Sequence, residues 1–323
     1  MNSSPRSILK TVVVTLGTAM LASSAFGYGD EGHQTVGAIA DRLLQQAPHA
    51  AAGIRALLGN ETLEKAATWA DAVKYHFNPH DPEMVAFDHA NPHVPDNSGP
   101  HDHHAYHYTD IPIQETHYRA GSAGAKNIDV VHMISNCIQI LKGRGNATNN
   151  PTNIPPKIAL RLLVHFVGDI HQPLHVGAAY FGPNATLVNP NSVQGSQADR
   201  GGNLISFHST NLHGYWDNEA LKNAMAKAGA HTPGGFADFF VQHPPQGWSN
   251  LGSVTGWPVK WAGEILPLAA QAHSRLTFRT APHGWNAHSD DLPAYDAWAS
   301  DQVTNEIGRA GYRLAAVLKK IWP

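Results

Sequence analysis

The chain of 323 residues is poor in cysteine, in charge and in long apolar runs. Its single cysteine, Cys137, excludes an intramolecular disulfide, so stability must come from packing and from any bound metal. Cys137 lies in the apolar run 130–141, where a buried, unreactive thiol is expected. Charged residues make up 15% and the formal net charge is -3, which argues against a generic basic nucleic-acid-binding protein. Hydrophobic residues make up 42%, which is typical of a globular chain rather than a disordered one.

The apolar run near the N-terminus, residues 11–22, is too short to span a membrane. Two basic residues precede it and the small-residue pattern Ala25-Phe26-Gly27 follows it, an arrangement typical of a secretory signal peptide. We therefore expect residues 1–27 to be removed, Tyr28 to become the mature N-terminus and the protein to be secreted or periplasmic. The alternative is a retained amphipathic N-terminal arm.

Helical periodicity dominates the rest of the chain, and few stretches alternate as strands do. The best strand candidate is 204–208, next to the turn signal Gly201-Gly202. Two long segments rich in turn-forming residues, 77–106 and 177–202, are predicted to be loops. We predict a mainly α-helical protein with long loops and little β-structure, in which residues 28–323 form one domain. The clearest helical segments are 32–45, 127–141, 156–170 and 303–321.

Histidine is abundant: there are 22, as many as Lys and Arg together. Neutral imidazole is the commonest metal-binding side chain, so this number favours metal binding. In the fragment Val164–His175, His165 and Asp169 are four residues apart and share one face of a helix. Pro173 should end that helix, which lets His175 turn back toward the same place. The spacing predicts a site that holds more than one ion.

Four other fragments carry suitable side chains. They contribute Asp71 from Trp69-Ala70-Asp71, the pair His107 and Asp110, the pair His213 and Asp217 at helical spacing, and His33. These are nitrogen and oxygen donors without thiolate, which suits zinc and a catalytic rather than a structural site. Taken singly, each fragment has an ordinary reading, such as a hydrogen-bonded pair, a solvated helix residue or a cap. Their number and the apolar setting of residues 162–167 favour metal, because buried polar groups need partners.

Together with the segment Gly201-Gly202-Asn203 and the C-terminal fragment Gly311–Ala315, these fragments resemble, in order, the single-strand-specific nuclease/3′-nucleotidase family. The fungal nucleases S-one and P-one belong to it, and zinc-dependent phospholipases C are distant relatives. The resemblance implies a mainly helical fold with three zinc ions. It assigns Asp71, His107, His165 and Asp169 to the first ion and His175, His213 and Asp217 to the second. The third would be held by His33, Asp169 and the amino and carbonyl groups of Tyr28.

The resemblance also implies an activity. Single-stranded DNA, RNA and nucleotides would be the substrates and 5′-phosphates the products, because paired zinc ions activate water and clamp the phosphate. No stable protein partner is implied. Asp110 would orient the attacking water, and Lys74 would add charge at the phosphate unless it is an ordinary solvated surface lysine. Tyr108 would stack on a base unless it belongs to the core, and Asn203 would contact the base.

Three departures from the family pattern stand out. Tyr28 replaces the Trp usual at the mature N-terminus, residues 177–199 resemble an insertion, and the histidines of 77–106 have no family role. The family's disulfides are impossible here. Two alternative functions remain at this stage: a zinc-dependent phospholipase C, which would need an extended apolar lipid-facing surface, and a non-catalytic zinc-binding protein, which would explain the histidines but not the ordered carboxylates.

Overall fold

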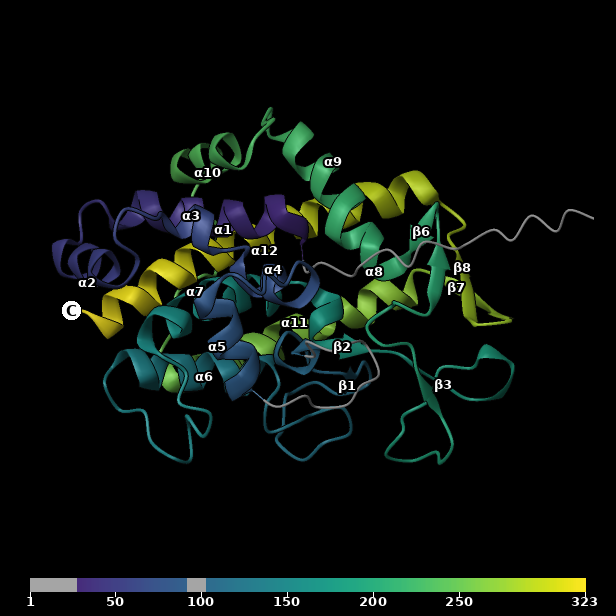
Figure 1. Cartoon of the computed structure of the whole chain (residues 1–323). Helices are drawn as coiled ribbons and strands as arrows, with labels where there is room; N and C mark the ends of the chain where they lie inside the picture. Colours follow the sequence, from purple (N-terminus) through teal and green to yellow (C-terminus); the bar gives the residue numbers. More distant parts are fainter. Residues whose placement is uncertain (1–27, 92–102) are drawn as a thin grey trace, which may run out of the picture.

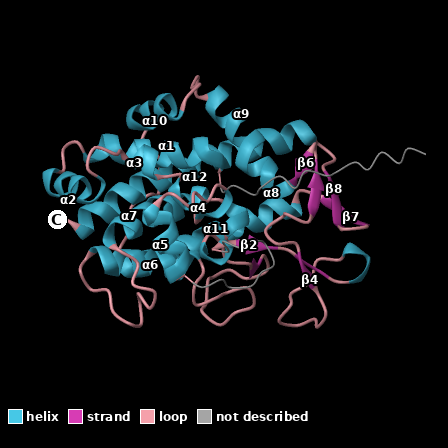
Figure 2. Cartoon of the chain, in the orientation of Figure 1, coloured by secondary structure: helices cyan, strands magenta, loops and turns pink. Residues whose placement is uncertain are grey.

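The computed structural model describes residues 28–91 and 103–323 (Figure 1). The predicted signal peptide 1–27 therefore lies outside the described residues, as do His93 and His101 of the His-rich segment. The prediction of a mainly α-helical fold is confirmed (Figure 2). The α-helices are α1 (Gly29–Leu44), α2 (Pro48–Leu58), α3 (Leu63–Ala66), α4 (Trp69–Tyr75), α5 (Pro82–Ala90), α6 (Val130–Leu141), α7 (Pro156–Asp169), α8 (Leu212–Gly214), α9 (Ala220–Lys227), α10 (Pro233–Gln242), α11 (Trp257–Ser274) and α12 (Leu292–Ile321).

Short helical turns and strands complete the described fold. The turns are the 3-10 helices η1 (His104–Tyr106), η2 (Pro173–His175), η3 (Pro183–Ala185) and η5 (Val254–Gly256), and the π-helix η4 (Tyr215–Glu219). The strands are β1 (Ile111–Pro112), β2 (Gly177–Ala178), β3 (Tyr180–Phe181), β4 (Gln197–Ala198), β5 (Ile205–Phe207), β6 (Thr210–Asn211), β7 (Thr277–Ala281) and β8 (Gly284–His288). β1 pairs with β2 in parallel and β3 with β4 antiparallel, and the order β6-β5-β8-β7 forms a four-stranded sheet.

Helix α7 is the centre of the molecule. Every residue from Ile158 to Asp169 is buried, as expected of a helix with neighbours on all sides. Pro156 occupies the first turn, where the missing N–H costs nothing, and Pro173 begins the 3-10 turn that follows the helix. Helix α12 runs alongside α1 and also contacts α7 (Figure 1). The site residues of α7 are therefore fixed by the packing of the whole core.

The loop prediction for 77–106 is wrong over part of its length, because α5 and η1 lie within that segment. Asp81 caps α5: its Oδ1 accepts the N–H groups of Glu83 at 2.8 Å and Met84 at 3.2 Å, and Pro82 opens the helix. The segment 177–202 likewise contains β2, β3, η3 and β4. Strands of two residues are too short to show an alternating pattern in sequence.

The helical prediction was otherwise close. The segments 32–45, 127–141 and 156–170 correspond to α1, α6 and α7, whereas 303–321 covers only the C-terminal part of α12. The strand prediction at 204–208 is confirmed by β5. Across 28–91 and 103–323 there is no helix with the length and apolar character that a membrane span requires.

The close packing of α1 against α12 depends on Gly311. A Cβ at this position would lie 2.5 Å from Cβ of Ile39, so Gly311→Ala must push the two helices apart. We expect a loss of about 1–3 kcal/mol in the free energy of unfolding, measured by chemical denaturation at fixed zinc. Gly263 in α11 is the matched control, since its Cβ would meet nothing within 4 Å. Gly263→Ala should stabilise by about 0.5–1 kcal/mol. Equal effects of the two substitutions would contradict the packing argument.

Candidate metal centre

Three groups of buried His and Asp side chains lie together around the C-terminal end of α7. We call them the Asp71 group (Asp71, His107, His165), the His213 group (His175, His213, Asp217) and the His33 group (His33, His165, Asp169). Within each group the potential ligand atoms lie within 4.8 Å of one another. The residues come from α1, α4, α7, η2, α8, η4 and the residue after η1. The structure therefore brings together eight predicted ligand side chains that are scattered over 185 positions of sequence, from 33 to 217.

Asp169 stands where these groups meet. Its Oδ2 lies 3.0 Å from Nδ1 of His107 and 3.3 Å from Nε2 of His165. Its Oδ1 lies 3.4 Å from Nε2 of His33 and 3.3 Å from Nδ1 of His175. The two carboxylate oxygens thus face different groups, which is the arrangement a bridging carboxylate requires.

Backbone carbonyls orient three of the histidine rings. The Nδ1 atoms donate to carbonyl oxygens at 2.7 Å for His165 to Ala67, 2.8 Å for His175 to His107 and 2.7 Å for His213 to Gly201. Because a carbonyl oxygen only accepts, Nδ1 carries the hydrogen in each ring and Nε2 keeps its lone pair. A second hydrogen bond of this kind is what fixes the tautomer of metal-ligating histidines.

The spacing of the inward nitrogens also fits a metal. Nε2 of His175 lies 3.1 Å from Nε2 of His213, and Nδ1 of His107 lies 3.1 Å from Nε2 of His165. Zinc–nitrogen bonds of about 2.0–2.1 Å in tetrahedral geometry separate two ligand nitrogens by about 3.3–3.4 Å. In the His175–His213 pair both neutral rings carry their hydrogen on Nδ1, so two lone pairs face each other at 3.1 Å, and a cation between them would turn that repulsion into attraction.

The buried charge of the site also indicates metal binding. The carboxylates of Asp71, Asp169 and Asp217 are 2%, 0% and 0% exposed. Burial of ionised carboxylates is costly unless cations compensate it. Within the described residues, both ring nitrogens of His33 and Oδ2 of Asp217 have no hydrogen-bond partner. The donor set and its unsatisfied atoms therefore fit a group of bound metal ions.

Burial keeps two of the site histidines in the protonation state that favours metal binding. It lowers the pKa of His175 and of His213 to about 4, so both imidazoles are neutral at pH 7. Burial raises the pKa of Asp217 to about 8, against the opposing effects of His175 and of the hydrogen bond from Gln172. Without a nearby cation, Asp217 would therefore hold its proton near neutral pH.

Comparison with known proteins identifies the family. The family model S1/P1 Nuclease matches residues 28–323. The chain belongs to the S1/P1 nuclease family. It is 26% identical to Endonuclease 4 of Arabidopsis thaliana over 342 residues, covering 100% of this chain and 97% of the relative. It is 26% identical to Nuclease S1 of Aspergillus oryzae (95% and 96% covered) and 25% identical to Nuclease P1 of Penicillium citrinum (91% and 97% covered). The resemblance inferred from the motifs is confirmed, and the protein is a hydrolase of the nuclease class.

Within this family member, Tyr28 and two glycines shape the site. Tyr28 is fully buried, its backbone N donates to Oδ1 of Asp217 at 3.1 Å, and its hydroxyl donates to the carbonyl of His171 at 2.7 Å. Gly168 makes room for the ring of His33, since a Cβ there would lie 2.6 Å from its Nδ1. A Cβ on Gly32 would lie 2.5 Å from Cβ of Tyr28. Glycine is therefore required at two places where a helix approaches a site residue.

Lys74 is not a solvated surface lysine. Its side chain is 3% exposed, and its ammonium lies 2.8 Å from Oδ1 of Asp71, one helical turn earlier. That alternative reading of Lys74 is wrong, because the i,i+3 spacing on α4 turns the lysine inward onto a buried carboxylate.

The other predicted residues lie outside the three groups. Asp110 is partly buried, and burial together with the charge of Asp199 raises its pKa to about 7, against the opposing charges of Lys126 and Arg200. Tyr108 is partly buried beside His107, with Nζ of Lys126 5.3 Å from the centre of its ring. Asn203 belongs to the turn that contains Gly201, and its Nδ2 donates to the carbonyl of Arg200 at 2.9 Å.

Sequence reasoning missed Gln172 and Gly168, although both lie inside the fragment Val164–His175. Nε2 of Gln172 donates to Oδ1 of Asp217 at 2.8 Å and so orients a predicted ligand. The glutamine between Asp169 and His175 was a visible signal, but no spacing rule assigns it to a carboxylate 45 residues away.

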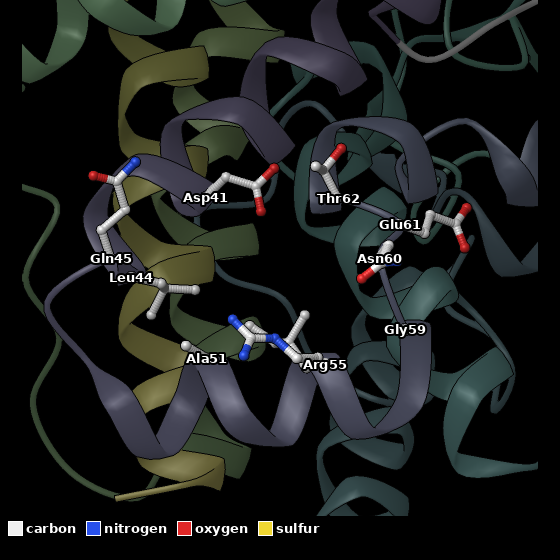
Figure 3. A pocket seen from close by; sticks show the side chains of 10 residues that line it. Asp41, Leu44, Gln45, Ala51, Arg55, Gly59, Asn60, Glu61 and Thr62 are labelled. Carbon is white, nitrogen blue, oxygen red and sulfur yellow. The ribbon is translucent and has the colours of Figure 1, made fainter.

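A pocket of about 470 Å³ lined by residues of α1, α2 and the turn before α3 is separate from this centre (Figure 3). No member of the three groups lines it. Asp41, which points into it, is already used: its two oxygens accept the N–H groups of Leu63 at 3.1 Å and Glu64 at 3.0 Å. The pocket thus contains a helix cap and not the ligand chemistry of a metal site.

Removal of metal should destabilise the protein, because the buried carboxylates of Asp71 and Asp169 would lose charges that compensate them. An ion present at 100 times its dissociation constant contributes about 2.7 kcal/mol. For a domain of this size we expect the unfolding temperature to fall by at least about 5 °C on chelation, and to recover on adding zinc. Differential scanning calorimetry with parallel metal analysis measures both. An unchanged unfolding temperature after complete metal removal would show that the groups are stable without ions.

Proposed function

We propose that this nuclease is a secreted, zinc-dependent endonuclease that cleaves single-stranded DNA and RNA to products with 5′-phosphates. Residues 1–27 are the signal peptide in this proposal, and residues 28–323 are the catalytic domain. The observation that carries it is the position of Asp169, whose two oxygens face different groups of buried ligands. Nitrogen and oxygen donors without thiolate favour zinc at a catalytic site.

The proposed ligand sets follow the predicted ones. Asp71, His107, His165 and Asp169 hold the first ion, His175, His213 and Asp217 the second, and His33, Asp169 and the amino and carbonyl groups of Tyr28 the third. Signal cleavage matters because a peptide N–H has no lone pair to offer, whereas a free amino group has one. The backbone N of Tyr28 already lies 3.1 Å from Oδ1 of Asp217, which supports a role for the processed terminus at this centre.

The bound ions would supply Lewis-acid activation of water and neutralisation of the phosphate. The chain's own residues provide positioning. Asp110 accepts a hydrogen bond from the attacking water, and a pKa raised to about 7 suits a proton acceptor near neutral pH. Lys74 forms an ion pair with Asp71 and places positive charge beside the phosphate.

Selectivity for single strands would come from base stacking. An exposed base stacked on an aromatic ring contributes about 1–3 kcal/mol, whereas a base in a duplex must first be unpaired. Tyr108 adjoins the proposed ligand His107 and is only partly buried, so its ring can contact a base beside the metal centre. Asn203 presents its amide oxygen to the base, since its Nδ2 is held by the carbonyl of Arg200. 3′-Nucleotides present the same phosphoryl group and leaving 3′ oxygen, so we expect 3′-nucleotidase activity as well.

The proposal is tested with mature protein that starts at Tyr28. We expect about three zinc ions per chain and faster cleavage of single-stranded DNA and RNA than of duplex DNA. Chain ends labelled with phosphate-specific chemistry should show 5′-phosphates. Cleavage of phosphatidylcholine without cleavage of nucleic acid would replace the proposal with a phospholipase C. Zinc retained without any hydrolysis would leave a zinc-binding protein.

Protein that keeps residues before Tyr28 is the internal control for the third ion. It should hold fewer zinc ions and be less active than mature protein at the same zinc concentration. Equal zinc content and activity would remove Tyr28 from the ligand set.

Two Asp→Asn substitutions separate water orientation from metal binding. Asp110→Asn should lower kcat by about 10²–10⁴-fold with zinc content unchanged, because the group lies outside the three ligand groups. Asp169→Asn should lose both zinc and activity, because it removes a carboxylate that faces two groups. Metal analysis and initial rates on a single-stranded oligonucleotide measure the difference. An active, fully loaded Asp169→Asn protein would refute the bridging role.

A further inference from the structure

A buried acid–histidine pair lies outside the three ligand groups of the candidate metal centre. Oδ2 of Asp199 is 2.8 Å from Nε2 of His273, and both side chains are 0% exposed. Nδ1 of His273 donates to the carbonyl of Ala269 at 2.8 Å, which directs Nε2 at the carboxylate. Burial disfavours the charged imidazole, but the hydrogen bond and charge of Asp199 outweigh it and raise the pKa of His273. None of the three ligand groups includes this pair.

Asp199 ties two neighbouring segments together. Its Oδ1 accepts the N–H of Ala179 at 3.1 Å, and its own N–H donates to the carbonyl of Ala179 at 2.8 Å. Its carbonyl accepts the N–H of Leu204 at 3.0 Å. Ala179 follows β2, shortly after the ligand His175, and Leu204 ends the turn that contains Asn203. His273 of α11 anchors this junction to the helical core.

The turn that Asp199 introduces has a backbone that needs such an anchor. Arg200, Gly201 and Gly202 have φ angles of 56°, 58° and 82°, all in the left-handed region. That conformation is unfavourable for a non-glycine residue, so Arg200 adopts it only where the surroundings hold it. Gly201 also approaches the chain closely, since a Cβ there would lie 2.2 Å from the carbonyl oxygen of Leu174.

The same turn holds a ligand of the His213 group. The carbonyl of Gly201 accepts the Nδ1–H of His213 at 2.7 Å, which directs the Nε2 of that ring toward His175. A shift of the turn would therefore rotate or release the imidazole of His213. His273 contacts Asp199, the chain continues from Asp199 through Arg200 to Gly201, and the carbonyl of Gly201 holds His213.

We propose that the Asp199–His273 ion pair positions the second zinc ligand set by fixing the turn 200–203 against His213. The inference rests on the proposed zinc function, and it makes Asp199 and His273 positioning residues that touch neither zinc nor substrate. It also gives the end of the segment 177–199 a role, since Asp199 joins that segment to the site.

The test measures zinc retention of the mature protein over a series of buffered free-zinc concentrations. His273→Leu leaves the Asp199 carboxylate buried without its partner. The free zinc needed to half-fill the most weakly held ion should rise about 10–100-fold, as for other residues that orient metal ligands. His273→Gln can still donate an N–H to Asp199, so its shift should be smaller. If His273→Leu does not fold, the Gln variant carries the test.

The double variant His213→Ala/His273→Leu locates the effect. Once the ligand at 213 is gone, loss of His273 should weaken zinc binding no further, because residues acting through one another are non-additive. A zinc curve for the foldable His273 variants that matches wild type would overturn the proposal. So would an additive loss in the double variant.

His132→Leu is the matched control. Nδ1 of His132 lies 2.9 Å from Oδ1 of Asp129, so it too belongs to an acid–histidine pair, but at the start of α6. It should lower the stability of the metal-free protein without changing zinc retention. If His273 had only a structural role, His273→Leu would likewise lower stability without changing zinc retention. Because zinc retention is measured without nucleic acid, a wild-type protein that binds zinc but cleaves nothing would refute only the proposed activity. A wild-type protein without zinc affinity would refute the zinc centre before any variant is made.

Discussion

The structure depends on the burial of Asp169 at the C-terminal end of the buried helix α7. An ionised carboxylate in that position is tolerated only with compensating partners, and four imidazole nitrogens lie within 3.4 Å of its oxygens. Burial lowers the pKa of His33, of His107 and of His175. For His165 the charges of Asp169 and Asp71 outweigh burial and raise the pKa. Neutral rings supply no charge, so cations placed between the rings and the carboxylate would satisfy both. Helix α7 therefore stabilises the fold through its apolar faces and defines the site through its polar end.

Backbone carbonyls, rather than other side chains, orient three of the five histidine rings of the site. The carbonyls of Ala67, His107 and Gly201 come from three separate segments, and each fixes one ring. Their positions follow from helix packing and turn conformation. Metal affinity and folding would thus be coupled, because whatever moves α3, η1 or the turn 200–203 also moves a proposed ligand. Ligands placed in this way need little reorganisation when an ion binds.

Local sequence patterns predicted the parts of the site that local backbone geometry determines. The spacing of His165 and Asp169 predicted one helix face, and Pro173 predicted the end of that helix. The loop prediction for 77–106 was wrong over α5: the segment is rich in turn-forming residues, but Asp81 and Pro82 start a helix there. The surface alternative for Lys74 is wrong because the ammonium lies 2.8 Å from the buried Asp71 carboxylate. Asp199 and His273 are 74 residues apart, and no periodicity links them. Tertiary packing alone makes them partners.

Tyr28 shows how one residue can have two separable roles. Its side chain is held by the carbonyl of His171, whose ring nitrogen Nε2 in turn lies 3.0 Å from Nη1 of the buried Arg313 on α12. Its backbone N points at Asp217. In the proposed centre, the side chain anchors the terminus and the backbone supplies ligands, so an aromatic residue other than Trp serves if it fills the same space. The hydroxyl of Tyr28 adds a hydrogen bond to the carbonyl of His171. Processing at Gly27 would then change the chemistry of one nitrogen that the fold already holds in place.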